Sequence, residues 1–248
     1  MNPTTVCLLT LAFAPTPPEI HTDYAAAYHQ ARDRKLLLVD FESGFDLNRL
    51  SPGQLSDYVV CRVPADCEIE FDGETRPLLE FAAFRHLERQ PGLAIIDLKH
   101  RGRPDVYKQT VSVLPRRHVT TDKVRALLDL PAGTLTQRTL VWALRVHPQR
   151  PRSVYGVPDP RLMAHCQRHC QVQCRRNDQH HAASNPGRSE IVAESWPWNK
   201  NIVDAAIDIV WSWSCSSGHW SAACRPWRAY GYDMQTNGQK WYATGVFD

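Results

Sequence analysis

The sequence predicts an α/β protein, with helices and strands mixed along the chain and divided between two domains. Apolar residues alternate between helical spacing and short continuous runs typical of buried strands. All eight tryptophans lie between Trp142 and Trp241. This change in composition, together with Pro131 and Gly133, indicates a domain boundary near residues 128–139. A chain of 248 residues is long enough for one large or two small domains.

Residues 1–18 are similar to a secretory signal peptide followed by a proline-rich spacer. An apolar core from Val6 to Ala14 ends in the small-residue pattern Ala12-Phe13-Ala14. A start without export function is the alternative, because the segment has no basic residue and Pro15 would hinder cleavage. We therefore expect export to the periplasm, cell surface or extracellular space, with the cytoplasm as the alternative. No later segment has the roughly 20 apolar residues of a membrane span.

The charge pattern gives no indication of nucleic-acid binding. The formal net charge is +3, and the basic pairs Arg116-Arg117 and Arg175-Arg176 are short and scattered. Nucleic-acid-binding proteins usually concentrate basic residues on one face or along one helix. We therefore expect no nucleic-acid partner.

Residues 19–130 are expected to form the first domain. A helix over 22–35 follows from the cap residue Thr22 and helical apolar spacing, and the apolar run 35–42 predicts a buried strand. The later expected elements are a helix start at 51–59, a strand at 59–66, a helix at 76–90, a hairpin at 91–112 and a helix at 121–130.

This order of elements resembles a thioredoxin-like domain, and Pro91 resembles the proline that opens the corresponding strand in that family. Thioredoxins carry a C-x-x-C pair after the first long strand, whereas this chain reads "FESGFDLN" at 41–48. Cys61 and Cys67 do not have the spacing of that pair. Because thiol–disulfide exchange needs a thiolate, we expect a redox-inactive scaffold or docking domain.

Residues 133–248 are expected to begin with helices over 134–147, 159–174 and 201–213. Asp159 followed by Pro160 is typical of a helix start, and Asn201 is a candidate cap. Two strand-like runs, 230–234 and 240–247, flank a turn at Asn237-Gly238.

Three cysteines at four-residue spacing, Cys166, Cys170 and Cys174, lie on one face of the predicted helix 159–174. We expect this face to pack as small apolar surface, since buried cysteine often behaves as a small hydrophobe. A soft-metal site that includes His165 or His169 is the alternative.

Five motifs in order over residues 133–248 resemble the CAP superfamily, or SCP-like domain, in its compact bacterial form. They are the cysteine helix with "QHHA", then "AESW", "WSCSSGHW", "YGY" and "WYATGVF". The resemblance implies an α-β-α sandwich with a cleft. It places the two cleft histidines at His181, with His180 as the alternative, and at His219.

The same resemblance places the glutamate of the family's G-E-N segment at Glu194. Ala193 and Ser195 replace the usual Gly and Asn, and Asp208 is the nearest candidate for a second acidic residue. Two imidazoles and a carboxylate are ligands that suit a divalent cation such as zinc. In the alternative interpretation, His219 caps a helix end and Glu194 accepts hydrogen bonds from backbone amides.

The expected function is that of an exported, non-catalytic binding or scaffold protein that presents the cleft to a peptide, glycan or lipid. Trp196, Trp220 and Tyr242 are the candidate groove residues. The alternative function is a metal-assisted hydrolase that uses His181, Glu194 and His219. If the chain is exported, Cys215 and Cys224 are a candidate disulfide pair.

Overall fold

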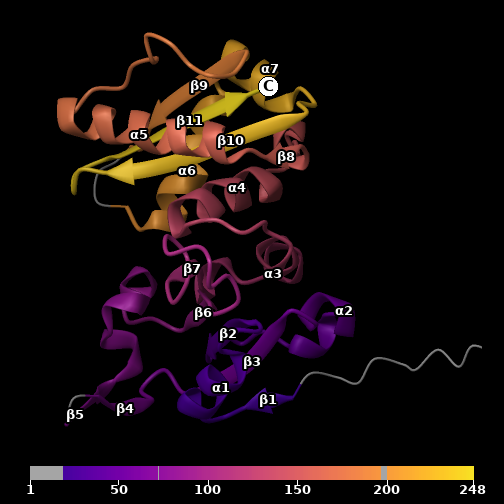
Figure 1. Ribbon diagram of the computed structural model, residues 1–248, viewed down its shortest axis with the longest axis vertical. Helices are drawn as coiled ribbons and strands as arrows, with labels where there is room; N and C mark the ends of the chain where they lie inside the picture. Colours follow the sequence, from indigo (N-terminus) through magenta and orange to yellow (C-terminus); the bar gives the residue numbers. More distant parts are fainter. Residues whose placement is uncertain (1–18, 72, 197–199) are drawn as a thin grey trace, which may run out of the picture.

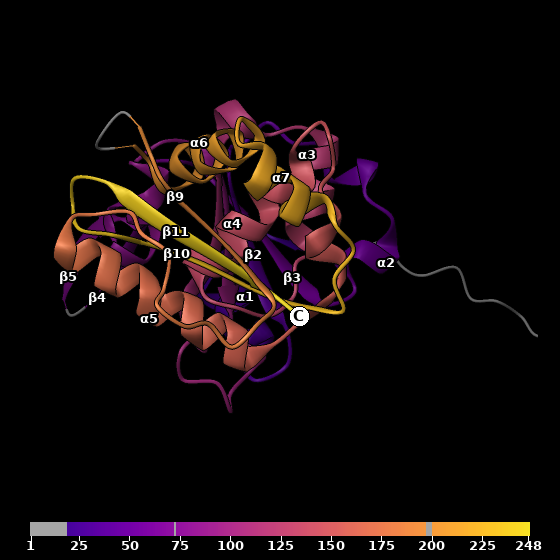
Figure 2. The same ribbon diagram turned by 90° about the horizontal axis from the view of Figure 1, so that it is seen from above.

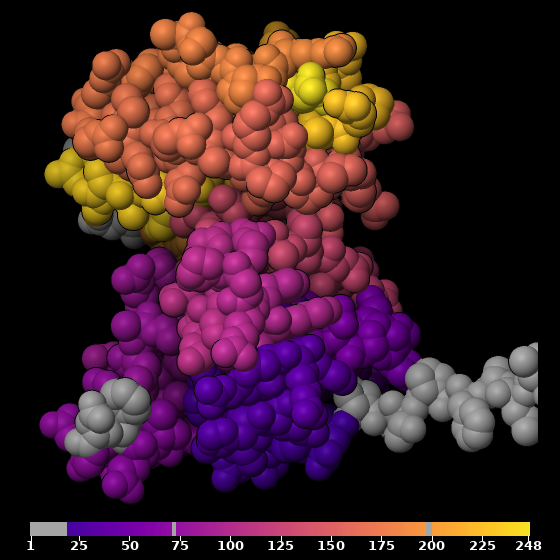
Figure 3. Space-filling view, in the orientation of Figure 1, coloured from indigo at the N-terminus to yellow at the C-terminus, as the bar shows by residue number. Residues whose placement is uncertain are grey.

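The computed structural model describes residues 19–71, 73–196 and 200–248, so the candidate signal peptide at 1–18 lies outside the described residues. Helices and mixed sheets together confirm the α/β class. Two sheet-containing halves are stacked along the long axis of the molecule and meet at a narrower waist (Figures 1 and 3). Among the described residues, no helix combines the length and apolar composition needed to cross a bilayer.

A five-stranded mixed sheet organises the first half, and its strand order is β1-β3-β2-β6-β7. The strands are β1 (Ile20–His21), β2 (Leu36–Phe41), β3 (Tyr58–Val63), β6 (Gly92–Asp97) and β7 (Thr110–Pro115). Strands β1, β3 and β2 are parallel, whereas β6 and β7 are each antiparallel to the preceding neighbour. Every residue of β2 and β6 is buried, as their continuous apolar runs predict.

The helices of this half are α1 (Tyr24–Ala31), α2 (Pro52–Leu55) and α3 (Thr121–Leu128). A separate hairpin consists of β4 (Glu68–Phe71) and β5 (Glu74–Pro77). Helix α1 begins one residue later than expected, because the side chain of Asp23 rather than Thr22 accepts the capping hydrogen bond from Ala26 N.

The prediction of a single helix over residues 76–90 is wrong. The segment contains two short 3-10 helices, η2 (Leu78–Glu80) and η3 (Ala82–Leu87), and ends at Glu88 with a left-handed backbone. The buried side chains Phe84 and Leu87 are three residues apart, and a 3-10 helix has about three residues per turn. This tighter winding turns both side chains into the core, where Phe84 contacts Phe41.

The second half contains a four-stranded sheet in the order β8-β10-β11-β9. Its strands are β8 (Val157–Pro158), β9 (Ser189–Glu194), β10 (Ala229–Thr236) and β11 (Trp241–Phe247), and its helices include α5 (Pro160–Arg176), α6 (Ile202–Ser214) and α7 (Ser217–Cys224). Figure 2 shows α5 on one side of the sheet and α6 with α7 on the other. Strands β10 and β11 and the helices α5 and α6 match the sequence prediction, whereas β9 and α7 were not predicted.

Helix α5 packs closely against β10 through small residues. Cys166 and Cys170 are fully buried, and their thiols donate to the carbonyl oxygens of Gly231 and Asp233 at 3.3 Å. A Cβ atom at Gly231 would lie 2.3 Å from the backbone carbon of Leu162, so this approach requires glycine. The predicted packing role is thus confirmed for these two cysteines, while Cys174 is only partly buried.

The predicted disulfide between Cys215 and Cys224 does not form, because both residues are free thiols. Cys215 caps the end of α6 and Cys224 is the last residue of α7. Residues 217–223 of α7 lie between them, and a helical segment of this length spans about 10 Å. That separation exceeds the roughly 7 Å limit between the Cα atoms of a disulfide.

Helix α4 (Leu135–Val146) joins the two halves. It contacts β7 and α3 of the first half and α6 and β10 of the second. All residues from Gln137 to Leu144 are buried, so the helix has no continuous solvent-facing side there. Thr134 and Gln137 form a capping box, in which each side chain accepts a hydrogen bond from the backbone N–H of the other residue at the start of the helix. The buried apolar core consequently continues from one half into the other.

The guanidinium group of Arg138 on α4 is buried and fully engaged. Its Nε donates to Ser112 Oγ at 2.8 Å, and its terminal nitrogens donate to three carbonyl oxygens. These acceptors are Leu127 O at 3.3 Å, Leu130 O at 3.0 Å and Pro131 O at 2.7 Å. Burial lowers the pKa of Arg138, while carbonyl groups at the end of α3 are favourable partners for its positive charge. One side chain therefore ties α4 to both β7 and α3.

Polar contacts at the surface connect the halves a second time. Asp204 on α6 accepts from Arg117 at 2.6 Å and pairs with His118 at 2.7 Å. The side chain of Asn201 donates to the carbonyl oxygen of His86 at 2.7 Å. These contacts link α6 to the end of η3 and to the short 3-10 helix η4 (Arg116–His118) that follows β7.

Asp233 on β10 is a fully buried carboxyl group, and no cationic side chain in the described part of the chain pairs with it. Its oxygens accept from Met234 N at 2.7 Å and Gln137 Nε2 at 3.4 Å. Burial raises the pKa of Asp233 to about 6, although these hydrogen bonds act in the opposite direction. Ionisation of this group in the folded state is therefore unfavourable.

Replacing Arg138 by methionine is expected to lower the free energy of unfolding by at least about 3 kcal/mol, because buried carbonyl and hydroxyl acceptors would lose their donor. Urea unfolding followed by circular dichroism measures the change. Arg168→Met, at an exposed position of α5, is the control and should change stability by less than about 0.5 kcal/mol. A similar small effect of Arg138→Met would contradict the role of this side chain in the joint.

Asp233→Asn should stabilise the protein at neutral pH. The folded pKa of Asp233 is about 6, above the ordinary value of 3.8, so the native state loses stability as the pH rises through this interval. The variant should gain up to about 3 kcal/mol over the wild type at pH 7.5 and almost nothing at pH 3.5. Urea unfolding at both pH values measures the difference, with exposed Asp66→Asn as control. An equal effect at both pH values would rule out ionisation of Asp233 as its cause.

Candidate functional site

His181 is held by a buried carboxylate. It lies in the loop after α5, with its side chain 56% exposed, and its Nδ1 is 2.9 Å from Oε1 of Glu190. Glu190 lies on β9 with its side chain only 4% exposed, and the same oxygen accepts from Ala182 N at 2.9 Å. When Nδ1 carries the proton, Nε2 is left as an acceptor, and nothing within the described residues hydrogen-bonds to it.

His219 faces His181 from the first turns of α7. The centroids of the two rings are 5.7 Å apart and the ring planes are inclined by 46°. Burial lowers the pKa of His219, and the neighbouring His181 lowers it further, so His219 is neutral at pH 7. We refer to His181, Glu190 and His219 together as the histidine face.

Three further imidazoles lie behind the histidine face. His165 Nε2 is 3.6 Å from Oε2 of Glu190, which is too long for a hydrogen bond. The ring of His169 stacks with that of His165 at 6.1 Å and meets that of His180 edge-on at 5.1 Å. His169 Nε2 donates to the carbonyl oxygen of His180 at 2.8 Å, and burial lowers the pKa of His169. These contacts attach the loop after α5 to the helix.

Glu194 does not supply the carboxylate of the histidine face. It lies four residues after Glu190 on the same strand, about 13 Å away. Its Oε1 accepts from Trp196 Nε1 at 2.8 Å and from Lys240 Nζ at 3.2 Å. Residues 190 and 194 lie on the same side of the strand. The sequence pattern therefore indicates that side of the strand, but it does not distinguish which of the two glutamates contacts the loop after α5. The assignment of the carboxylate is corrected to Glu190.

The two weaker candidates also have other partners. His180 Nδ1 is 3.1 Å from the carbonyl oxygen of Asp178, and its ring contacts His169. Asp208 on α6 accepts from Trp196 N at 2.6 Å and pairs with Lys200 at 3.0 Å. Asp208 therefore holds the segment that follows β9, and neither residue completes the histidine face.

The three aromatic residues expected in a groove do not line one together. Tyr242 lies in β11, between β10 and β9, and is fully buried, so the expectation is wrong for this residue. Its hydroxyl donates to Asn177 Oδ1 at 2.9 Å, and burial raises its pKa to about 12. Trp220 packs on His147, whereas exposed Trp196 lies beneath the ammonium of Lys240.

The residues of the histidine face do not fit the three-ligand metal site that the resemblance implies. No group of three His, Cys, Asp or Glu side chains in the described part of the chain has an arrangement suited to a metal ion. Glu190 Oε1 is already engaged by His181 and Ala182 N. Within the described residues, no Ser, Thr or Cys side chain hydrogen-bonds to the exposed imidazole of His181 or to the half-buried imidazole of His219. The arrangement is suited to hydrogen bonding and proton exchange with a bound polar group.

Glu190 was not among the candidates from sequence, and His165 was named only as an alternative metal ligand beside the three cysteines. The signal for Glu190 was the alternation in "SEIVAE", which is typical of a strand with its acidic residues on one face. His165 and His169 share a face of α5 because they are four residues apart.

Comparison with known proteins found no matching family model, no matching curated protein and no matching solved structure. The geometry of the chain itself is therefore the basis for the function proposed below.

His181→Asn should raise the pKa of His219, because the imidazole of His181 is one of the two causes that lower it. The rise should be partial, since burial is the larger cause and remains in the variant. Two-dimensional NMR of the histidine ring protons measures the titration. His180→Asn, whose ring contacts His169 instead, should leave the pKa of His219 unchanged. An unchanged titration in His181→Asn would show that the two rings are not coupled.

Proposed function

We propose that this chain is a non-catalytic binding protein whose ligand contacts the histidine face. One observation carries the proposal: buried Glu190 orients His181 so that Nε2 faces outward beside neutral His219. Two neighbouring imidazoles offer both donors and acceptors to a polar ligand group. Within the described residues no hydroxyl or thiol hydrogen-bonds to these imidazoles, which favours binding over covalent chemistry.

The proposal includes a thioredoxin-like first half without thiol chemistry. The strand order β1-β3-β2-β6-β7, with three parallel strands and an antiparallel hairpin, supports this resemblance. The segment after β2 contains no cysteine, and Cys61 is fully buried in β3. Burial raises the pKa of Cys61 to about 12, which keeps its thiol protonated at neutral pH.

A CAP-like second half is the other part of the proposal. Its sheet lies between α5 and α6, which is consistent with the α-β-α sandwich that the resemblance implies (Figure 1). The convergence of His181 and His219 is a second supporting feature. We propose an exported protein whose ligand is a peptide, glycan or lipid.

The metal-assisted hydrolase is the less supported alternative. It requires a third ligand beside the two imidazoles, but Glu194 is engaged with Lys240 and Trp196 instead. Because His181 and His219 are adjacent, the experiment below also tests for zinc-dependent hydrolysis.

The test is a binding screen of the full chain with peptides, oligosaccharides and phospholipid vesicles, followed by affinity measurement by calorimetry. For the ligand found, His181→Asn and His219→Asn should each weaken binding at least tenfold. His29→Asn, on the exposed last turn of α1, is the control and should leave the affinity unchanged.

Each ligand is also incubated for a long period with and without added zinc, and products are analysed by mass spectrometry. Unchanged ligand is the expected result. Zinc-dependent cleavage that His181→Asn abolishes would replace the binding function by the hydrolase. A screen in which no affinity depends on His181 or His219 would reject the proposal.

A further inference from the structure

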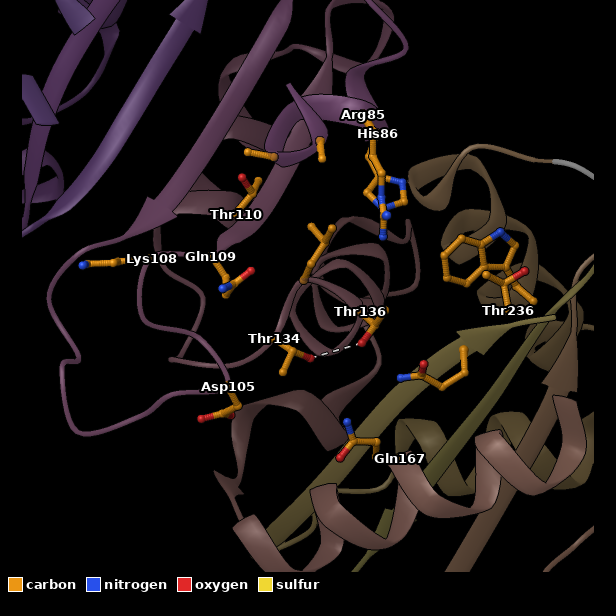
Figure 4. A pocket seen from close by; sticks show the side chains of 15 residues that line it. Arg85, His86, Asp105, Lys108, Gln109, Thr110, Thr134, Thr136, Gln167 and Thr236 are labelled. Atoms are coloured by element: carbon orange, nitrogen blue, oxygen red, sulfur yellow. Dashed lines mark hydrogen bonds between the residues drawn. The ribbon is translucent and has the colours of Figure 1, made fainter. Parts of the chain in front are cut away.

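A polar groove lies between the two halves, away from the histidine face. Its volume is about 560 Å³, within the range of small-molecule binding sites. The first half contributes the end of η3 and the loop before β7, and the second half contributes the first turn of α4 and parts of α5, β10 and β11. Figure 4 shows side chains of both halves directed into the space between them.

Arg85 is the cation best placed to bind a ligand in this groove. No carboxylate within the described residues pairs with its guanidinium, and its Nε lies 3.3 Å from Nε2 of His86. Burial, with a contribution from Arg85, lowers the pKa of His86 to about 4, so the neutral ring accepts this hydrogen bond. In Figure 4 the two side chains project together into the groove. Among the residues that the structure describes, no hydrogen bond engages the terminal nitrogens of Arg85, so they can donate to a ligand.

Contacts with the second half hold this cation in place. The carbonyl oxygen of His86 accepts from Asn201 Nδ2 at 2.7 Å, and the ring of His86 lies 6.4 Å from that of Trp241. These contacts fix the backbone and ring that position Arg85. The imidazole to which Arg85 donates is therefore held by the same contacts that join the halves.

The other charges of the groove do not oppose an anion. Asp105 is neutralised by Arg103, which donates from Nε at 3.1 Å and from a terminal nitrogen at 2.5 Å. Lys108 lies at the rim in Figure 4 and adds a second positive charge without a carboxylate partner in the described chain. The groove therefore has a net positive charge.

Hydroxyl and amide groups form most of the remaining wall. The hydroxyls of Thr134 and Thr136 are 3.1 Å apart and lie opposite Arg85 in Figure 4. The amides of Gln109 and Gln167 face the same space, whereas the hydroxyl of Thr236 is engaged by Lys240 O and Gly238 N. Such groups donate and accept in pairs, which matches the neighbouring hydroxyls of a sugar.

The site extends on both sides of Arg85. A second hollow of about 300 Å³ shares Arg85, His86, Thr236 and Trp241 with the groove and continues toward Glu88 and Lys200. A ligand that fills both hollows has to be elongated, with its anionic group near the middle. Polar and charged side chains outnumber apolar ones in the lining of both hollows, which favours a ligand rich in hydroxyl groups over one recognised through apolar pockets.

We propose that this groove binds an anionic oligosaccharide, with Arg85 pairing with a carboxylate or sulfate and the threonine and glutamine side chains binding sugar hydroxyls. The site is independent of the proposed function, because it includes none of His181, Glu190 and His219. Guanidinium groups bind carboxylates and sulfates by paired hydrogen bonds, so both sources of charge fit the same chemistry.

The experiment is calorimetric titration of the full chain with three probes: tetragalacturonate, a heparin-derived tetrasaccharide and neutral maltotetraose. At least one anionic probe should bind, and the stronger one identifies carboxylate or sulfate as the recognised group. Maltotetraose should bind at least tenfold more weakly. Arg85→Gln should weaken anionic binding at least tenfold, and Gln167→Glu should weaken it by adding a negative charge to the opposite wall.

Two matched controls separate the groove from general charge effects and from the histidine face. Arg89→Gln removes an exposed arginine that pairs with Glu80 outside the groove and should not change the affinity. His181→Asn should also leave it unchanged. The proposal is overturned if neither anionic probe binds at millimolar concentration, if maltotetraose binds equally well, or if Arg85→Gln retains wild-type affinity.

Discussion

The burial of α4 between two sheets is the constraint on which the rest of the molecule depends. A helix with eight consecutive buried residues has to find partners on all sides, and neither sheet alone supplies them. The first half provides β7 and α3, and the second provides α6 and β10. Arg138 is compatible with this burial only because Ser112 and the carbonyl groups after α3 accept all of its observed hydrogen bonds. The two halves therefore share one core.

This shared core determines where the two candidate sites lie. The groove exists because η3 of the first half is held against Trp241 and Asn201 of the second. The histidine face lies wholly within the second half, on the loop after α5, on β9 and on α7. Close packing of α5 on Gly231 places His165 of that helix 3.6 Å from Glu190, so the small residues at this contact contribute indirectly to the site.

The sequence predicted those elements whose formation depends on neighbouring residues, such as apolar runs and helix caps. The apolar runs of β2 and β6 and the Asp159-Pro160 start of α5 have direct sequence signals, and the structure matches them. Residues 76–90 were misassigned because three- and four-residue apolar spacings look alike over a short segment. Strand β9 was missed because its outer residues are polar. The choice of Glu190 over Glu194, and the meeting of His86 with Asn201, depend on tertiary packing that a linear pattern does not contain.

The continuity of the core has a kinetic consequence. Many proteins that bind ligands between two lobes close around them by a hinge, and this motion limits how fast they associate. Here the two halves are connected by buried helix α4 and by the hydrogen bonds of Arg138, so no flexible hinge separates them at this point. Binding at the groove should then proceed with little rearrangement of the backbone, at a rate set by diffusion and charge attraction. Differences in affinity between ligands would accordingly appear in their residence times.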